Sequence, residues 1–240
     1  MDTDFAGSVS IDQTQIVSLH SEQPRVLQMT DGTVLEAQPL RVENELLVVS
    51  GETIDKDFTL DDLTKTDPED WELGIGYKWT GLVNFAWVLE RGNTDTDELD
   101  YRLDTTLQGD DDRDTLRFNG EVDEANGVKN ADNWTLIAKY DHFLEDRWYW
   151  GVLASAEQDE FADLDLRSYF GPYMGRQLLT EPALELEAEL GLVWVTEDFL
   201  TAPDNEYPGA NWNIHAQSNY LGGDSRLYVD HIGIWDLDNG

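Results

Sequence analysis

Cysteine is absent from all 240 residues of the sequence. Its absence excludes disulfides, thiolate nucleophiles and Cys-based zinc sites. Basic residues are also few, because 15 Lys and Arg stand against 51 Asp and Glu and leave a formal net charge of -36. A chain this acidic repels the phosphates of nucleic acids, so we expect no nucleic-acid partner. The same charge is typical of proteins in a salty medium, where screening weakens the repulsion among carboxylates.

Long apolar runs and familiar catalytic motifs are missing as well. No stretch of 18 apolar residues is present, so the sequence predicts no transmembrane helix. Gly74-Ile75-Gly76 begins like a dinucleotide-binding loop, but Trp79 stands where the third glycine belongs. The four histidines have no metal-binding spacing, and no Ser-His-Asp pattern of a known type occurs. We therefore expect no enzyme activity and no cofactor.

Aromatic residues, by contrast, make up 11% of the chain and include nine Trp. Segment 79–107 shows how they are arranged. In its first half, apolar residues including Trp79, Phe85 and Trp87 alternate with polar ones, and the second half alternates in the same way. Since strand side chains point alternately to opposite faces, each half predicts a strand with one apolar and one polar face. Gly92-Asn93 between them tolerates positive φ, which predicts a hairpin turn.

The same alternation continues along most of the remaining chain. It predicts seven strands of about ten residues between 79 and 195, and two more around 213–220 and 226–235. The charged face carries Glu98, Asp100, Arg102, Asp104, Arg117, Glu121, Lys139, Asp165, Arg167, Glu185, Glu187 and Glu189. The apolar face carries Trp79, Phe85, Trp87, Leu99, Tyr101, Phe118, Trp134, Tyr140, Trp148, Trp150 and Trp194. The fold class that this pattern favours is all-β, an antiparallel meander β-barrel of the outer-membrane type.

Alternation by itself leaves two orientations of such a barrel open. A membrane barrel turns its apolar face to lipid, whereas a soluble barrel such as a lipocalin turns it inward. Aromatic residues near the strand ends favour lipid contact, because they resemble an interfacial girdle. The mixture of acids and bases on the other face favours a water-filled lumen. We expect the charged set to face the lumen and the apolar set to face outer-membrane lipid. The alternative is a soluble β-barrel that binds an apolar small molecule in its interior.

Cations are the small partners that the charge pattern predicts. A lumen lined by so many carboxylates favours cations over anions. Asp110-Asp111-Asp112 forms a further carboxylate cluster in a turn, where oxygen ligands are suited to Ca²⁺ or Mg²⁺. The cluster lacks the spacing of an EF-hand loop, and a solvated turn is the simpler interpretation. No metal ligand is assigned from the sequence.

The chain divides into three parts by composition. Residues 1–51 contain short predicted strands around 8–11, 16–19, 25–29, 33–37 and 45–49, which indicate a small all-β unit of SH3-like size. Residues 52–70 are polar and acidic and contain Pro68, so they are the predicted linker. Residues 71–240 are the predicted barrel.

Ordered motifs in the predicted barrel are similar to those of one protein family. They begin with Trp79-Thr80-Gly81 and Arg91-Gly92-Asn93-Thr94-Asp95-Thr96, and continue through Lys139-Tyr140-Asp141-His142-Phe143, Asp146-Arg147-Trp148-Tyr149, Gly171-Pro172-Tyr173-Met174-Gly175 and Glu187-Ala188-Glu189-Leu190-Gly191. In this order, over roughly residues 71 to 200, the chain resembles the DUF481 family. Members of that family are described as salt-induced outer-membrane proteins of Gram-negative bacteria, the YdiY-like group.

The resemblance implies an outer-membrane β-barrel with a soluble periplasmic part before it, and it implies no catalytic activity. A secreted member is expected to begin with a signal peptide, which the opening MDTDFAGS does not resemble. Outer-membrane barrels usually finish on an aromatic residue, whereas this sequence finishes on Asp238-Asn239-Gly240. From these two departures we expect a barrel that is incomplete at the C-terminus and truncated upstream.

Overall fold

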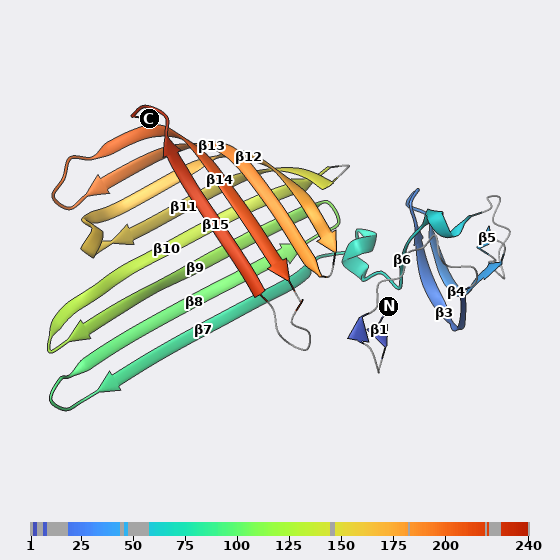
Figure 1. Cartoon of the computed structure of the whole chain (residues 1–240), viewed down its shortest axis with the longest axis horizontal. Coiled ribbons are helices and arrows are strands. Elements are labelled where there is room, and N and C mark those ends of the chain that lie inside the picture. The colour runs from blue at the N-terminus through green and yellow to red at the C-terminus, as the bar shows by residue number, and fades with distance from the viewer. Residues whose placement is uncertain are drawn as a thin grey trace. The chain divides into compact units, whose positions relative to one another are not determined.

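The computed structural model of the chain describes residues 2–3, 7–8, 19–43, 46–47, 58–144, 147–181, 183–218, 220 and 227–239. The chain forms two compact units, Met1–Leu73 and Gly74–Gly240. The paired strands of both units are antiparallel among the described residues (Figure 1). None of the helices among the described residues is long and apolar enough to cross a membrane.

The first unit contains a four-stranded sheet in the order β5-β4-β3-β6. Its strands are β3 (Leu19–Met29), β4 (Val34–Glu43), β5 (Leu46–Leu47) and β6 (Leu63–Thr66). The short strands β1 (Asp2–Thr3) and β2 (Gly7–Ser8) pair with each other. Gly32, with φ of 82°, turns the chain between β3 and β4 as the Asp31-Gly32 pair predicts. The core of the unit is formed by Leu27, Met29, Val42, Phe58, Leu60 and Leu63.

The predicted linker is largely part of this first unit. Residues 52–57 lie outside the described residues, and so do 9–11, 16–18, 45 and 48–49 of the predicted strands. Residues 58–70 contain the 3₁₀ turn η2 (Leu60–Asp62) and β6, which pairs with β3. Phe58 and Leu60 supply core side chains. Acidic composition predicted a linker here because the few apolar residues that anchor the segment are spaced among many carboxylates.

Asp67 anchors the end of β6 through its charge. Its carboxylate accepts from Arg25 Nη1 at 2.5 Å and from the Val26 N–H at 3.0 Å. The Arg25 hydrogen bond, assisted by the Val26 N–H, holds the pKa of Asp67 below its usual value. Because the folded-state pKa is lowered, this stabilisation is complete above the unfolded pKa and is lost as the pH falls through the folded pKa.

We expect Asp67→Asn to lower the free energy of unfolding of the first unit by about 0.5–1 kcal/mol at pH 7. Asn tolerates the positive φ of 50° at this position, so the substitution removes the charge with little backbone strain. The difference should shrink as the pH falls below about 4 and should be lost once the pH is below the lowered pKa of the folded carboxylate. Urea unfolding followed by amide signals of the unit measures it, with Asp61→Asn as control. An equal loss at pH 3 and pH 7 would contradict the charge-based explanation.

The second unit is one nine-stranded sheet in the order β15-β14-β13-β12-β11-β10-β9-β8-β7. All neighbours are antiparallel and consecutive in sequence, so the sheet is a meander that is open between β7 and β15. The all-β meander fold is thereby confirmed. The strands are β7 (Lys78–Glu90), β8 (Thr96–Gln108), β9 (Asp112–Ala125), β10 (Val128–Phe143), β11 (Trp148–Asp159), β12 (Leu164–Glu181), β13 (Leu184–Phe199), β14 (Asn205–Ser218) and β15 (Leu227–Asp236).

The seven strands predicted between 79 and 195 are present as β7–β13. The strand predicted at 213–220 begins earlier, at Asn205, and Pro208 and Gly209 lie inside β14. The Pro208 carbonyl accepts from the Leu237 N–H, so the Pro208 nitrogen also points toward the side of β15. Pro208 lies just beyond Gly209, the last residue of β14 in the β14–β15 register. The proline therefore removes no hydrogen bond of the β13–β14 ladder, because its nitrogen points away from β13.

The opening hairpin pairs Glu90 with Thr96 and closes with a five-residue loop, 91–95. The predicted positive φ at Gly92-Asn93 is wrong, because no residue of this loop adopts it. The longer loop reverses the chain without left-handed residues, and the Gly92 N–H donates to Asp95 Oδ1 at 3.1 Å. The β9–β10 turn is the tight one, where Asn126 and Gly127 have φ of 53° and 76°.

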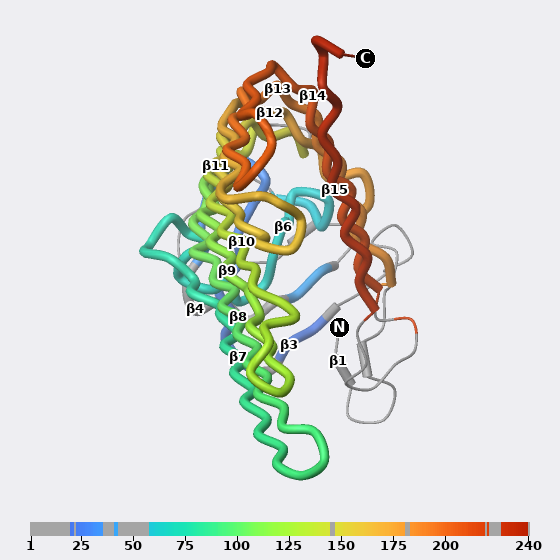
Figure 2. The backbone as a smooth tube through the Cα atoms, turned by 90° about the vertical axis from the view of Figure 1, so that its left-hand side faces the viewer, coloured from blue at the N-terminus to red at the C-terminus, as the bar shows by residue number. Residues whose placement is uncertain are grey.

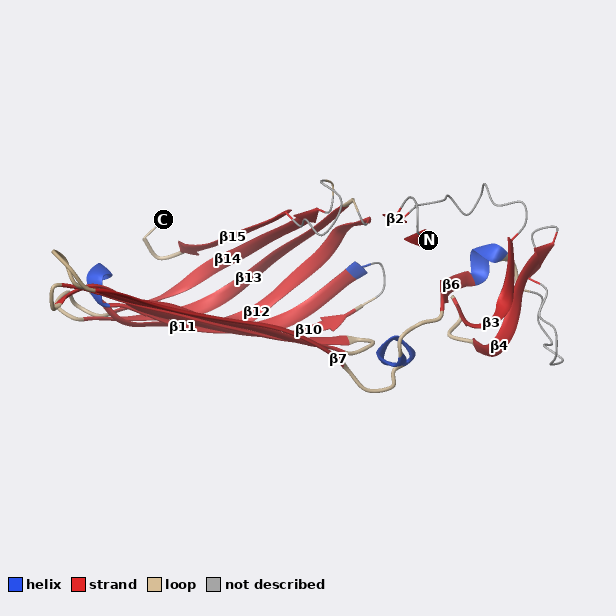
Figure 3. Cartoon of the chain, turned by 90° about the horizontal axis from the view of Figure 1, so that it is seen from below, coloured by secondary structure: helices blue, strands red, loops and turns tan. Residues whose placement is uncertain are grey.

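The sheet curves into a trough. Figures 2 and 3 show β14 and β15 folding back over the strands at the other end of the sheet, so the sheet has a concave and a convex face. Glycines on the concave face allow the curvature: Tyr149 lies over Gly175 and Tyr173 lies over Gly151 on the adjacent strand. These reciprocal pairs fill the concave face of β11 and β12 with the two rings. A Cβ at either glycine would overlap the facing tyrosine.

Candidate functional site

The strand register sorts the side chains of the sheet into two faces. Residues directly opposite each other on antiparallel neighbours share a face. Arg102 stands opposite Asn119 on one face, and Leu103 stands opposite Phe118 on the other. The polar face is the concave one, because its side chains contact each other across strands that are not neighbours in the sheet.

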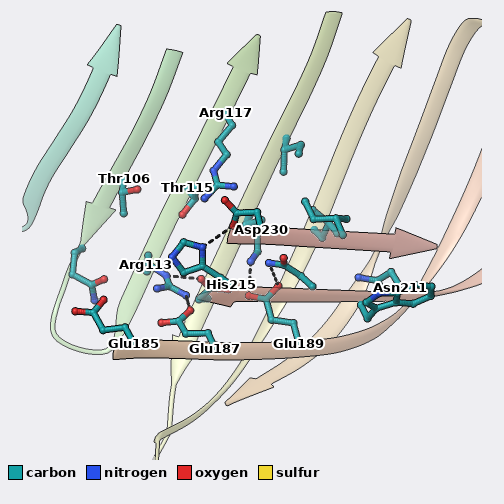
Figure 4. A pocket seen from close by; sticks show the side chains of 18 of the residues that line it. Thr106, Arg113, Thr115, Arg117, Glu185, Glu187, Glu189, Asn211, His215 and Asp230 are labelled. Carbon is teal, nitrogen blue, oxygen red and sulfur yellow. Dashed lines mark hydrogen bonds and ion pairs between the residues drawn. The ribbon is translucent and has the colours of Figure 1, made fainter. Parts of the chain in front are cut away.

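Arg113 on β9 makes the longest of these connections. Its Nε lies 2.7 Å from Asp141 Oδ2 on β10, and its Nη2 lies 3.3 Å from Glu187 Oε2 on β13. Three strands separate β9 from β13 in the sheet order. Figure 4 shows the Arg113 and Glu187 side chains pointing toward each other across the trough. The ion pair therefore holds the two sides of the curve together.

Two tyrosines and a lysine complete this buried group. Lys139 Nζ lies 2.6 Å from Glu189 Oε1, which also accepts from Tyr149 OH at 2.9 Å. Tyr173 OH donates to Asp141, whose side chain is 0% exposed. Buried carboxylates are tolerated only when paired and hydrogen-bonded, and both carboxylates meet that condition. We call this group the central cluster; its members are Arg113, Lys139, Asp141, Tyr149, Tyr173, Glu187 and Glu189.

A second ionic group lies on the concave face toward the other end of the strands. Arg167 Nη1 is 2.5 Å from Glu157 Oε1, and Arg167 Nε is 2.7 Å from Glu197 Oε1. Tyr207 OH donates to the same Glu197 oxygen at 3.2 Å. These contacts join β11, β12, β13 and β14. In both groups one arginine is shared between two acids: Arg113 between Asp141 and Glu187, and Arg167 between Glu157 and Glu197.

A cleft of about 320 Å³ opens beside the central cluster. We call it the central cleft. Its wall combines charged, amide and hydroxyl side chains with an apolar part formed by Ile137, Leu153 and Ile232. His215 and Asp230 form a further pair in it, with Nδ1 and Oδ1 separated by 2.6 Å. The acids of its lining outnumber the bases: Asp141, Glu185, Glu187, Glu189 and Asp230 against Arg113, Arg117 and Lys139.

The structure gathers part of the predicted lumen-facing set into these groups. Lys139, Glu187 and Glu189 belong to the central cluster, and Arg167 to the second group. Apart from Asp165, the other members of the set also lie on the concave face. Arg102 pairs with Asp104, Glu121 accepts from Asn133, Glu185 accepts from Gln217, Arg117 lines the central cleft, and Glu98 and Asp100 lie on the same face of β8.

Asp165 does not join the other charged residues. The register of β12 shifts between Leu164 and Leu166, where one extra residue interrupts the alternation. Leu164 is consequently buried on the side of Arg167, while Asp165 is exposed at the bulge. The alternation of residues predicted Leu164 on the apolar face and Asp165 on the charged face. A bulge shifts this alternation and cannot be recognised from the residue types of one strand.

Several members of the central cluster were missed from the sequence. Arg113 and Asp141 sit at strand ends, where a polar residue is expected in any case. Tyr149 lies in the run Arg147-Trp148-Tyr149-Trp150, which is too uniformly aromatic to show alternation. The alternation could have shown that Tyr149 and Tyr173 belong to the charged face, because both stand at odd-numbered positions, as Glu157 and Arg167 do on the same strands.

All residues of the predicted apolar set lie on the convex face. The rings are unusually open to the surroundings, with Phe85 and Trp87 on β7 exposed by 68% and 64%. Leu190 and Leu192 extend this surface on β13. The set comprises Trp79, Phe85, Trp87, Leu99, Tyr101, Phe118, Trp134, Tyr140, Trp148, Trp150 and Trp194.

The predicted cation position at Asp110-Asp112 has a more ordinary explanation. Asp112 Oδ1 accepts from Tyr140 OH at 2.7 Å and lies 3.1 Å from His142 Nδ1. Among the residues that the structure describes, no group of three or more acidic or histidine side chains is arranged to hold a metal ion. Asp112 therefore ties the β8–β9 turn to the rings at the end of β10.

Comparison with known proteins identifies the family. The model of the family described as "Protein of unknown function, DUF481" matches residues 83–239. No curated protein and no solved structure matches the chain. The family match covers β8–β15 and most of β7, which includes both ionic groups and the lining of the central cleft apart from Thr80. Since it spans more than half of the 240 residues, the chain belongs to the DUF481 family.

Proposed function

We propose that this protein is an outer-membrane β-barrel protein of the Gram-negative bacterial envelope. The convex face meets lipid, and the concave face lines a water-filled interior. Its role is structural or weakly transporting and non-catalytic, and the family resemblance connects it with salt or osmotic conditions. The observation that carries the proposal is the inverted distribution of side chains, with aromatic rings on the convex face and ion pairs on the concave face.

The apolar convex face needs an apolar environment that removes its side chains from water. A side chain as large as Phe85 or Trp87 gains about 1.5–3 kcal/mol when it is removed from water. Leaving many such side chains in water is unfavourable, and exposed apolar patches of this kind mark contact surfaces. Hydrocarbon covers a continuous strand-built surface without specific complementarity, which suits a face that extends over many strands.

The aromatic residues also have the spacing of two girdles. Trp79 and Tyr140 lie in one row of ladder partners, and Phe85, Tyr101 and Trp134 lie in another. Six residues separate the rows along both β7 and β10. At about 3.3 Å per residue the rows are about 20 Å apart, comparable with the apolar band of an outer-membrane barrel.

Cations are the solutes that the concave face favours. The carboxylates of the central cleft exceed its bases, and both Arg113 and Lys139 are already paired with acids. The remaining negative potential attracts cations and repels anions. A soluble barrel with an apolar ligand inside requires the opposite arrangement, and the outward rings of Phe85, Trp87 and Trp150 argue against it.

A spin-label experiment tests the orientation of the two faces. Because the chain has no cysteine, Leu190→Cys on the convex face and Thr115→Cys on the concave face each accept a single nitroxide. In reconstituted vesicles, we expect the label at 190 to be relaxed mainly by oxygen and the label at 115 mainly by a water-soluble nickel chelate. Membrane fractions of cells should contain the natural protein in the outer membrane. Cytosolic fractionation, or reversed accessibility of the two labels, would refute the proposal.

A further inference from the structure

A second cleft on the concave face continues from the central cleft. It has a volume of about 770 Å³ and lies along β7, β8, β9 and β10, toward the β7–β8 loop. We call it the distal cleft; Asp100 and Glu121 are among its polar lining residues. Arg117, Ile137 and Ile232 line both clefts. The two spaces therefore meet at these three residues.

Together the two clefts extend over most of the length of β8. The central cleft includes Gln108, the last residue of this strand, and the distal cleft includes Asp100, close to its first residue Thr96. At about 3.3 Å per residue, Gln108 and Asp100 are about 26 Å apart. This length is close to the height of the apolar band of an outer-membrane barrel, about 25 Å. The clefts thus follow the strands from one end of the sheet to near the other.

The point where the clefts meet lies between opposite sides of the trough. Arg117 on β9 and Ile137 on β10 stand directly opposite each other in the strand register, so they belong to the same side. Ile232 comes from β15, at the far edge of the sheet. Tyr228 of the same strand interacts with Arg102 on β8, so β15 reaches across the trough to the first strands. At this point the space is bounded by β8–β10 on one side and by β15 on the other.

The central cluster fills the part of the trough beside this point. Arg113 pairs with Glu187 and Lys139 pairs with Glu189, so β9 and β10 are both joined to β13. The side chains of Lys139 and Glu189 are only 15% and 6% exposed. Because these side chains occupy the space next to β13, the open part of the concave face is displaced toward β15, where the two clefts meet.

Arg117 differs from the other bases that line the clefts. Arg102 and Arg113 are paired with acids, whereas the described residues form no ion pair with Arg117 within 4.0 Å. Its opposite residue on β8, Asp104, is paired with Arg102. A guanidinium is always protonated in proteins, so Arg117 presents a permanent positive charge. This charge raises the energy of a cation where the clefts meet, although carboxylates predominate elsewhere in the lining.

We propose that the central and distal clefts form one water-filled passage for small hydrated ions, and that Arg117 determines its charge selectivity where the clefts meet. The carboxylates of both clefts attract cations, and the Arg117 guanidinium opposes their transfer from one cleft to the other. Ile137 and Ile232 limit the width at the same point. The inference rests on the proposed function, because it requires a hydrated interior, and it adds the route, the solute class and the residue that selects among solutes.

Ion conduction by the purified full chain in planar lipid bilayers tests the role of Arg117. The reversal potential under a gradient of dilute potassium chloride measures the ratio of potassium to chloride permeability. Arg117→Gln should raise this ratio about fourfold, the Coulomb effect of one charge at about 5 Å in water. Arg176→Gln removes an arginine from the convex face, where it stacks on Trp148, and should leave the ratio unchanged.

Two isoleucines of similar exposure test the width of the passage. Ile232 lines both clefts and is 46% exposed, whereas Ile214 lies on the convex face of β14 and is 43% exposed. Ile232→Ala should raise the single-channel conductance, and Ile214→Ala should leave it unchanged. Circular dichroism of the sheet in detergent micelles checks that each variant is folded.

Three results would overturn the inference: no ion conduction by the wild-type protein, equal permeability ratios in Arg117→Gln and Arg176→Gln, or equal conductances of Ile232→Ala and Ile214→Ala. Each of them is compatible with the expected accessibility of the spin labels at 190 and 115, and would then leave the structural role in the outer membrane intact. Reversed accessibility of the labels would refute the proposed function, and the passage with it.

Discussion

Replacing Arg113 by methionine is expected to destabilise the second unit by about 3–5 kcal/mol, because it leaves buried carboxylates without their cation. Asp141 is fully buried, and Glu187 reaches the same guanidinium from β13. Methionine retains much of the packing volume of the arginine stem, so the loss isolates the charge. Unfolding in urea, monitored in detergent micelles by circular dichroism of the sheet, measures the change.

Arg117 provides the matched control for this substitution. It lies on the same strand and the same face, and the described residues form no ion pair with it within 4.0 Å. Arg117→Met should cost less than about 1 kcal/mol. Equal effects of the two substitutions would show that Arg113 contributes no more than an exposed arginine. Recovery of stability in Arg113→Met at low pH, where the carboxylates are protonated, would support the charge mechanism.

Gly171→Ala is expected to cost about 3 kcal/mol or more, since there is no space for even one methyl group. An ideal Cβ at Gly171 would overlap the carbonyl oxygen of Leu192 and lie 2.8 Å from Val193 Cα. Both atoms belong to the backbone of β13, so relief requires the two strands to move apart. The pairs Phe170–Trp194 and Tyr173–Gly191 on either side of this point have the same register.

Gly92→Ala is the control for the glycine substitution. Gly92 lies in the β7–β8 loop without positive φ, and no described atom lies within 4 Å of a Cβ placed there. Alanine at this position should leave the free energy of unfolding unchanged or raise it by up to about 1 kcal/mol, because it lowers the conformational entropy of the unfolded chain. If Gly171→Ala and Gly92→Ala unfold at the same urea concentration, then β12 and β13 are not in close contact at Gly171.

The features of the fold that depend on a period of two residues could be predicted from the sequence. Strand number and face assignment follow from alternation, which is long and regular in segments such as 79–107 and 184–194. Asp165 was assigned incorrectly to the charged row because a bulge changes the face without changing the residue types. The start of β14 was missed because Pro208 is compatible with a strand only where the neighbouring strand has ended.

The candidate site was less predictable because it depends on curvature. Arg113 and Glu187 are 74 residues apart, and only the bending of the intervening strands brings them within 3.3 Å. Alternation identified Glu187 as concave but supplied no partner for it. Asn211 Oδ1 occupies the space over Gly191, and a close approach of this kind has no signature in a single sequence.

The meander order of the sheet has a consequence for how the chain folds. Every strand of the second unit pairs with strands adjacent in sequence, so each ladder closes only a short loop and contact order stays low. Hairpins such as β9–β10, with its two-residue turn, can form early at small entropic cost. Contacts between strands that are not neighbours are the exception, and Arg113–Glu187 is one of them, because it cannot form until β13 has joined the sheet. The buried ion pair is thus a late step in assembly, and it fixes a curvature that the hairpins alone leave free.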